Sequence, residues 1–458
     1  MSNVKKRNTC VLYLTATCNL KCTYCYIDKS PVLQKIDDML VETYKTDYFY
    51  NFMIKVFPDP KQLESIEFWG GEPSYGLVRA INTVEKALNY YHNLNEFMMS
   101  TNLTTETWLD DFTGFLRLFK KYPERRIRFD LQLSLDGPTY INDANRGQGV
   151  TEKFTKNFSK LIFNVDKILE EIPNLSIHAH FKPTLDNSSI HSLQNKEDIK
   201  NYFLFFETYK AMADDVIHNP RWNLYLPLPN TAVPTPHTTQ DGKLFANLCK
   251  LAYELSVENE EKHYFKYFNN IVPFSTRNLH PLYCMNEGCG TCGTGSAVVG
   301  LLPNNLISVC HNGFVDLLSE YKEKAKKNAD SGIHSIDNNL FVEKDVNNQI
   351  AYTLEEYENK YEHIVNCYHG EALFQTTEVA SYIQMLANIG QVDKQYSEPK
   401  KAVEAAHFIF QSTSSCLRDN LGATGSRYLL HPGLIKLMLN GAKEYIENAN
   451  KKFSTRTR

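Results

Sequence analysis

Three cysteines lie close together near the N-terminus of the chain, at Cys18, Cys22 and Cys25, directly after an apolar stretch. Thiolates are the usual protein ligands of iron–sulfur clusters, so three of them on one short loop can hold three irons of a 4Fe–4S cube. The fourth iron is then left without a protein ligand, and a small molecule with an amine and a carboxylate can chelate it. The spacing therefore predicts a cluster with one open iron.

Two other uses of these cysteines fit the sequence less well. A structural zinc site needs a fourth Cys or His nearby, and the first His of the chain is His92. A disulfide framework is typical of short secreted chains, whereas this chain has 458 residues and 11 Cys, an odd number. The cluster is therefore the favoured interpretation.

Length and composition set the class of protein. With 458 residues, 42% of them hydrophobic, the chain can form two or three domains with sizeable cores. The net charge of −4 does not favour a nucleic-acid partner. No stretch approaches the ~20 apolar residues of a membrane span, and the apolar stretch before Cys18 is too short for a signal peptide. We therefore expect a cytoplasmic protein with neither a nucleic acid nor a membrane as its partner.

From residue 9 to about residue 230, short apolar runs alternate with segments of 3.6-residue periodicity. This alternation predicts an α/β fold with parallel strands and right-handed crossovers, in the form of a partial (β/α)6 barrel. The expected strands are residues 9–15, 65–70, 96–101, 129–135, 175–182 and 222–228, and the expected helices are residues 38–56, 77–91, 106–122, 152–169 and 190–212. Ligands of parallel α/β folds bind at the C-terminal ends of the strands, so motifs there are the candidates for chemistry.

The second expected strand ends in the sequence Gly70-Gly71-Glu72-Pro73. Two glycines let a ligand approach the backbone closely, and the proline fixes the turn that follows. The carboxylate of Glu72 can accept hydrogen bonds from an ammonium group. An ordinary turn between a strand and a helix is the alternative, but the position at a strand end favours a cofactor site.

Taken together, the cysteine run and this turn resemble the radical S-adenosylmethionine (SAM) enzymes, and the resemblance covers roughly residues 9–228. It implies that the three cysteines are the catalytic cluster ligands and that the Gly-Gly-Glu-Pro turn binds the amino group of the SAM methionine. The further SAM contacts that it implies are Tyr24 near the adenine, Ser100 and Asn102 after the third strand, and Ser134 and Arg146 at the ribose and carboxylate. Leu103 stands where the family usually has glycine, and Asp136 is expected to form a turn.

A second group of cysteines occurs late in the chain, around a segment that resembles the hairpin of the SPASM and twitch domains, which hold auxiliary clusters. The expected ligands are Cys284, Cys289, Cys292 and Cys310, with Cys367 as a substitute for one of them. The spacing of Cys289 and Cys292 also suits a zinc knuckle. Because the N-terminal motif already indicates iron–sulfur chemistry, we expect one auxiliary 4Fe–4S cluster; a second one would need a ligand other than these cysteines.

The predicted domains are a radical SAM barrel over residues 1–230, a helical linker over 231–280, an auxiliary SPASM/twitch-like domain over 281–370 and a helical C-terminal region over 371–458. The resemblance implies reductive cleavage of SAM to a 5′-deoxyadenosyl radical, which abstracts hydrogen from a peptide or protein substrate. We expect maturation of a ribosomally synthesised peptide, such as cross-link formation. A flavodoxin or ferredoxin would supply electrons, and a separate leader-binding protein would help recognition.

Two alternatives remain open. One is an anaerobic sulfatase maturase, which oxidises Cys or Ser to formylglycine, although His311 stands where those enzymes carry Asp after the hairpin cysteine. The other is an iron–sulfur electron carrier or scaffold without enzymatic activity. A carrier has no need of a SAM site, so Glu72, Ser134 and Arg146 favour an enzyme.

Overall fold

The computed structural model describes residues 7–25, 31–225, 230–231, 298–308, 351–359 and 372–412, with single residues between 244 and 255 and at 439. Its main feature is one sheet with the strand order β11-β10-β9-β1-β2-β3-β4-β5-β7. The strands are β1 (Thr9–Thr15), β2 (Ser65–Gly70), β3 (Glu96–Thr101), β4 (Ile127–Leu133), β5 (Leu175–Phe181), β7 (Trp222–Tyr225), β9 (Val298–Leu302), β10 (Leu306–Ser308) and β11 (Ala351–Thr353). Every pairing from β9 to β7 is parallel, and the pairs β9–β10 and β10–β11 are antiparallel.

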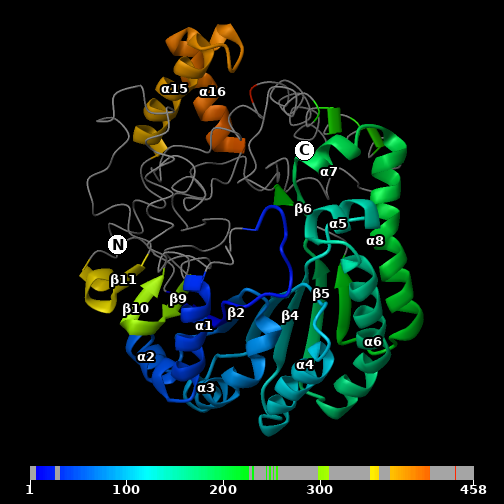
Figure 1. Cartoon of the computed structure of the whole chain (residues 1–458). Coiled ribbons are helices and arrows are strands. Elements are labelled where there is room, and N and C mark those ends of the chain that lie inside the picture. Colours follow the sequence, from blue (N-terminus) through cyan, green and yellow to red (C-terminus); the bar gives the residue numbers. More distant parts are fainter. Residues whose placement is uncertain are drawn as a thin grey trace, which may run out of the picture.

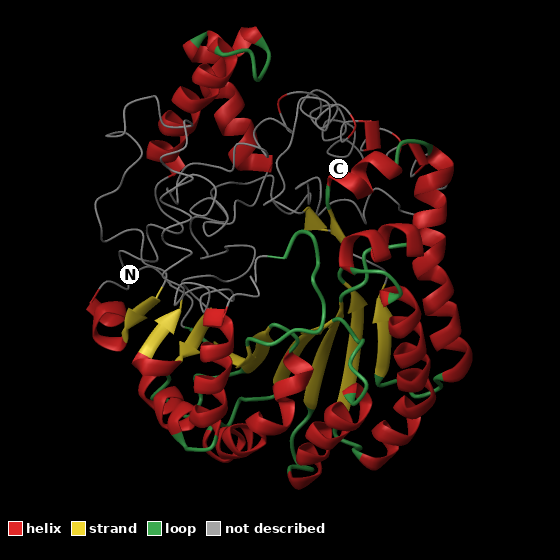
Figure 2. Cartoon of the chain, viewed as in Figure 1, coloured by secondary structure: helices red, strands yellow, loops and turns green. Residues whose placement is uncertain are grey.

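Helices follow the strands and cover one face of the sheet (Figure 1, Figure 2). In the first part of the chain they are α1 (Pro31–Tyr44), α2 (Tyr48–Val56), α3 (Leu77–Tyr90), α4 (Trp108–Leu116), α5 (Thr139–Arg146), α6 (Val150–Glu171), α7 (Asn187–Ser192) and α8 (Lys196–Val216). A separate pair, α15 (Ala372–Asn388) and α16 (Pro399–Ser412), packs together near the C-terminal end. The chain is therefore a mixed α/β protein whose sheet is mainly parallel.

Aromatic side chains fill the space between the sheet and the helices. Phe68 on β2 and Phe129 on β4 are fully buried. The ring centroid of Phe68 lies 5.2 Å from that of Phe115 on α4, and Phe129 lies 5.2 Å from Phe112 on the same helix. Both pairs meet edge to face, the arrangement that aromatic quadrupoles favour. Burying each such ring stabilises the fold by roughly 1.5–3 kcal/mol, so this layer fixes the sheet on its helices.

The opposite face of the sheet, which we call the inner face, carries side chains of a different kind. Alternate residues of a strand point to opposite faces, and the residues that alternate with the core residues of β2 to β5 are mostly polar. Apart from Gln132, which is buried, they are only partly buried. They are Glu67, Trp69, Met98, Ser100, Asp130, Gln132, His178 and His180. This pattern leaves hydrogen-bonding groups on the inner face just below the C-terminal ends of the strands.

The first three strands have the bounds that the sequence predicts, and β4 begins and ends two residues earlier than predicted. Two predicted helices are wrong in extent, because each is two helices. Residues 38–56 divide into α1 and α2 at a turn in which the amides of Lys45 and Thr46 bond three residues back. Residues 190–212 divide because Asn195 begins a new helix, its side chain accepting from the amide of Asp198 at 2.8 Å.

Strands from the late part of the chain extend the same sheet. β9 pairs in parallel with β1, with Val298 opposite Thr9. β9 and β10 form the predicted hairpin, and Asn305 in its turn has φ +58°, which an asparagine tolerates better than most residues. These strands lie within residues 281–370, the predicted auxiliary domain. Its expected cluster ligands Cys284, Cys289, Cys292, Cys310 and Cys367 lie outside the described residues.

Among the helices that the structure describes, none is long and apolar enough to cross a membrane.

Candidate functional site

The C-terminal ends of the parallel strands bring together the motifs singled out in the sequence. The cysteine loop follows β1, the Gly70–Pro73 turn follows β2, Asn102 follows β3 and Ser134 follows β4. Arg146 is the last residue of α5, the helix after β4. These segments are far apart in sequence and meet at one edge of the sheet (Figure 1).

The cysteine loop is tied to the body of the protein on both sides. At its start, the Thr15 hydroxyl donates to the Asp37 carboxylate, and the amide of Ala16 donates to the same oxygen at 2.9 Å. Towards its end, the amide of Thr23 donates to the carbonyl of Asn145 at 2.8 Å. Cys18 and Cys22 are half-buried and Cys25 is exposed. The three cysteines are therefore held on a loop of defined path.

The two glycines after β2 allow the cysteine loop to lie directly on this strand end. The amide of Gly71 donates to the carbonyl of Thr15 at 2.9 Å, and the amide of Glu72 donates to that of Thr17 at 2.8 Å. A Cβ atom would lie 2.1 Å from the Thr15 oxygen at Gly70 and 2.3 Å from the Thr17 oxygen at Gly71. No side chain fits at either position. The glycine pair therefore serves the cysteine loop itself.

Glu72 is buried and joins the end of β2 to that of β3. Its carboxylate accepts hydrogen bonds from the Thr101 hydroxyl at 2.8 Å, from the Asn102 amide at 2.7 Å and from the Ser74 amide at 3.2 Å. Burial raises the pKa of this carboxyl, and the hydrogen bonds lower it in part. In this structure the Glu72 carboxylate is thus hydrogen-bonded to donors of the protein itself. Its predicted contact with the SAM amino group stays a prediction.

The turn after β3 reaches back to the cysteine loop. The Asn102 side-chain amide donates to the Asn19 side chain at 2.9 Å and lies 3.8 Å from the Cys18 sulfur. Leu103 has φ +57° and is fully buried, so it adopts the left-handed conformation that glycine would supply. Asn157 on α6 donates to the carbonyls of Leu103 and Thr105, each at 2.9 Å. The turn therefore forms with leucine in the left-handed conformation that glycine adopts most easily.

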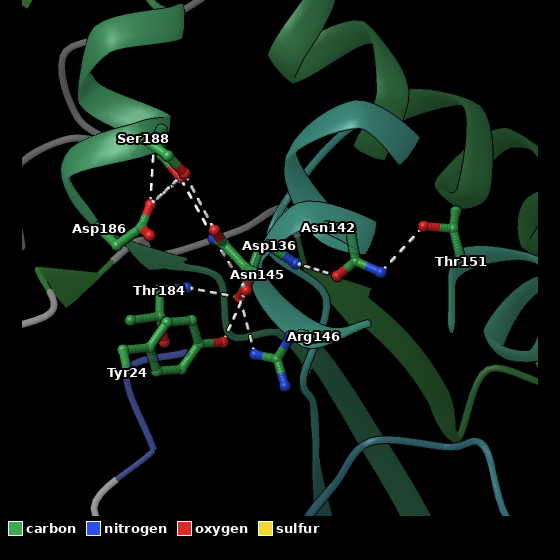
Figure 3. Close-up of polar contacts among 10 residues, drawn as sticks. Tyr24, Asp136, Asn142, Asn145, Arg146, Thr151, Thr184, Asp186 and Ser188 are labelled. Carbon is green, nitrogen blue, oxygen red and sulfur yellow. Dashed lines mark hydrogen bonds and ion pairs between the residues drawn. The ribbon is translucent and has the colours of Figure 1, made fainter. Parts of the chain in front are cut away.

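Asp136 is a residue whose role the sequence reasoning missed. It is fully buried, and it accepts hydrogen bonds from the Tyr24 hydroxyl at 2.6 Å, from Arg146 at 2.7 Å and from the Thr184 amide at 2.9 Å (Figure 3). The side-chain amide of Asn145 lies 3.3 Å from the same carboxylate. One carboxylate therefore connects the cysteine loop, α5 and the short strand β6 (Thr184–Leu185). The available signal was an acidic residue at a strand end with an arginine ten positions later.

Arg146 is buried, and one nitrogen of its guanidinium group, Nε, makes no hydrogen bond to the described residues. Its side chain is 7% exposed, and its Nε atom has no hydrogen-bond partner in the part of the chain that the structure describes. The guanidinium lies 5.6 Å from the centre of the Tyr24 ring. Buried polar atoms are nearly always paired, so an unpaired guanidinium nitrogen beside the cysteine loop marks a place for an acceptor from a ligand.

Burial also governs the protonation of the cysteines. It raises the pKa of Cys18 to about 12, and the nearby Glu72 charge contributes to the same shift. Burial raises the pKa of Cys22 too, while the charge of Arg146 lowers it. Within the described residues, no three His, Cys, Asp or Glu side chains are placed to hold a metal ion. Cluster binding by Cys18, Cys22 and Cys25 therefore requires these thiols to release their protons.

The remaining predicted SAM contacts lie at the same edge. Ser100 is on the inner face of β3, where its hydroxyl donates to Gln132 at 3.5 Å. Ser134 is half-buried, and its amide donates to the Thr101 carbonyl at 2.8 Å. Both hydroxyls are near the strand ends, and their contacts with SAM stay predictions.

No family model matches the chain, and no curated protein matches it. Several solved structures do. Polyhistidine-tagged anSMEcpe with bound AdoMet has a TM-score of 0.46 and 14% identity, over 97% of this chain and 96% of that one. Native anSMEcpe with bound AdoMet has a TM-score of 0.40 and 17% identity, over 66% and 74%. Streptococcus suis SuiB bound to S-adenosylmethionine has a TM-score of 0.34 and 13% identity, over 67% and 58%. These three TM-scores are below 0.5, so the similarities carry no argument about activity.

The contact between the glycine turn and the cysteine loop predicts that Gly71→Ala is destabilising. The new methyl group would meet the carbonyl oxygens of Thr17 at 2.3 Å and Ala16 at 2.8 Å, so the loop must move. We expect a loss of ~1–3 kcal/mol in the free energy of unfolding, measured by urea denaturation.

Gly114→Ala is the matched control, because Gly114 lies within α4 and a Cβ atom there meets nothing within 4 Å. We expect this change to stabilise the protein by about 0.5–1 kcal/mol. Equal unfolding free energies for the two variants would show that the cysteine loop is not in close steric contact with Gly71.

Proposed function

We propose that this protein is a radical SAM enzyme, with its 4Fe–4S cluster on Cys18, Cys22 and Cys25. The observation that supports this most is a juxtaposition at one sheet edge. A loop with three thiols lies beside a buried arginine whose Nε has no partner among the described residues. In this proposal the parallel strands β1, β2, β3, β4, β5 and β7 form a partial (β/α)6 barrel.

The residues at this edge fit a cluster with a SAM molecule on its open iron. Three thiols match three irons. The free donor of Arg146 suits the SAM carboxylate, because guanidinium and carboxylate form strong charge-assisted hydrogen bonds. When bound, the cluster supplies one electron for the reductive cleavage of SAM to methionine and a 5′-deoxyadenosyl radical.

The protein contributes position and charge to this chemistry. Asp136 accepts one hydrogen bond from Arg146 and one from Tyr24, so a single carboxylate orients both groups that face the ligand. Asp37 and Glu72 hold the start of the cysteine loop and the neighbouring strand ends. Fixed groups of this kind need no reorganisation when charge moves, which is how an enzyme site stabilises a reaction.

For the substrate we propose a peptide or protein, and for the reaction the maturation of a ribosomally synthesised peptide. The likeness of the sequence motifs to the peptide-modifying branch of the radical SAM enzymes supports this. An auxiliary cluster on the late cysteines, at Cys284, Cys289, Cys292 and either Cys310 or Cys367, belongs to the same proposal. An electron carrier is disfavoured, because it would not use a buried arginine with a free donor beside its cluster.

Replacing Cys18, Cys22 and Cys25 together with Ala should abolish the reductive cleavage of SAM. We expect the anaerobically reconstituted wild-type protein, reduced with dithionite, to form 5′-deoxyadenosine, and the triple variant to form none above the protein-free background. Liquid chromatography of the quenched reaction measures the product. Undiminished 5′-deoxyadenosine from a folded triple variant would end the radical SAM proposal.

The same triple variant tests the auxiliary cluster, because any iron that it binds after reconstitution lies elsewhere in the chain. One auxiliary 4Fe–4S cluster predicts about four iron and four sulfide per chain. Iron, zinc and acid-labile sulfide are assayed on the same sample. About one zinc without sulfide would contradict the auxiliary cluster, and the radical SAM proposal would stand.

Arg146→Lys should weaken SAM binding while preserving the charge beside Asp136. An ammonium can still pair with that carboxylate, but it cannot reproduce the planar fork or the free Nε donor. Loss of a charge-assisted hydrogen bond corresponds to ~1.5–3 kcal/mol, or roughly 10- to 150-fold in affinity. Equilibrium dialysis of SAM against the reconstituted proteins measures this change.

The matched control is Arg117→Lys, because the side chain of Arg117 is 60% exposed and lies after α4, on the helix side of the sheet. We expect its SAM affinity to equal that of the wild type. A dissociation constant of Arg146→Lys within twofold of the wild type would remove Arg146 from the SAM site.

A further inference from the structure

Three uncharged hydrogen-bonding groups form a row across the inner face of the sheet, one residue below the strand ends. Ser100 on β3 pairs in register with Gln132 on β4, and Gln132 pairs with His180 on β5. Neighbouring strands are about 4.8 Å apart, so the three side chains span roughly 10 Å. The next residues along these strands are Thr101, Leu133 and Phe181, at the edge where the proposed SAM site lies. A group bound over the row therefore lies next to that site.

His180 is the member of this row with unused hydrogen-bonding capacity. Its side chain is half-buried, and its ring nitrogens have no hydrogen-bond partner within the described residues. Gln132, by contrast, is held by Ser100 on one side and by the Met98 sulfur at 2.7 Å on the other. A half-buried imidazole without a partner has lost part of its hydration without compensation. Such a group is typical of a site that a ligand completes.

Burial, helped by nearby cations, keeps the imidazole of His180 neutral. Burial, with Lys182 and Arg128, lowers its pKa to about 4, and Asp130 opposes this shift. Asp130 is itself paired with Arg128 at 2.9 Å. The neighbouring His178 has a lowered pKa as well, and its ring lies 3.4 Å from the Tyr225 hydroxyl. At neutral pH the row therefore presents a hydroxyl, an amide and a neutral imidazole, and no net charge.

We propose that His180, with Gln132 and Ser100, forms a substrate subsite that binds an uncharged side-chain amide or hydroxyl of a peptide. A neutral imidazole offers one donor and one acceptor, which match an amide or a hydroxyl. A carboxylate or an ammonium would lose its hydration on binding to the row, whose own three groups carry no charge. The subsite rests on the proposed function, because it assumes that the substrate of the SAM site is a peptide.

The experiment measures peptide binding without turnover. The full-length reconstituted protein, saturated with SAM, is dialysed against two peptide pools of the form N-acetyl-Ala-X-Ala-amide. In one pool X is Asn, Gln, Ser or Thr, and in the other X is Asp, Glu, Lys or Arg. Mass spectrometry of both chambers gives the amount of each pool that the protein retains.

We expect the wild type to retain the uncharged pool at least about threefold better than the charged pool. His180→Leu should lower retention of the uncharged pool roughly 3- to 10-fold, as the loss of one hydrogen bond implies. His180→Gln keeps an uncharged donor and acceptor, so its retention should stay within about twofold of the wild type. Gln132→Met, which removes the amide at nearly constant volume, should lower retention as well.

His92→Leu is the matched control, because His92 is exposed in the loop between α3 and β3, at the opposite end of the strands. It should retain both pools as the wild type does. Equal retention of the two pools by the wild type, or unchanged retention by folded His180→Leu and Gln132→Met, would overturn the subsite. Wild-type cleavage of SAM, assayed on the same preparation, tests the proposed function separately. A failed subsite therefore leaves the radical SAM assignment intact.

Discussion

The site depends on the close contact between the backbone of the cysteine loop and the end of β2. Two amides, of Gly71 and Glu72, donate to the carbonyls of Thr15 and Thr17, and the space between the segments admits no Cβ atom. This contact fixes where the loop leaves β1. It also turns the Glu72 carboxylate towards the end of β3, where Thr101 and Asn102 bind it. One backbone contact thus sets the relative positions of three strand ends.

Buried carboxylates then hold the edge of the sheet together. Asp37 binds the first residues of the cysteine loop, Glu72 binds the β3 turn, and Asp136 binds Tyr24 and Arg146. Each carboxylate loses its hydration on burial, and the donors of the neighbouring segments replace the lost water. Such fully bonded acceptors specify one arrangement of the segments, because any other arrangement would leave a buried charge unpaired. Hydrogen bonds to buried carboxylates, more than apolar packing, therefore fix the segments at the C-terminal ends of the strands.

Much of this organisation follows from local sequence patterns. Apolar runs of strand length place β1, β2 and β3 correctly, and two glycines before Glu72 mark a close approach. The partner of that approach is not local, since it is the backbone of residues 15 and 17. The interior position of Asp136 is hidden for the same reason, because an Asp-Gly-Pro sequence is typical of an exposed turn. The left-handed Leu103 depends on Asn157, 54 residues away, which binds the carbonyls around it. A single sequence does not show which distant segments such hydrogen bonds join.

The position of β1 in the sheet has a consequence for synthesis of the chain. β1 lies between β2 and β9, and the register that places Thr9 beside Val298 joins residues 289 positions apart. At translation rates of about 5–20 residues per second, the second neighbour of β1 emerges roughly 15–60 s after it. Until then one edge of β1 presents unpaired amide and carbonyl groups, which invite pairing with other strands. The strand that leads into the cysteine loop is thus made long before the second strand that encloses it.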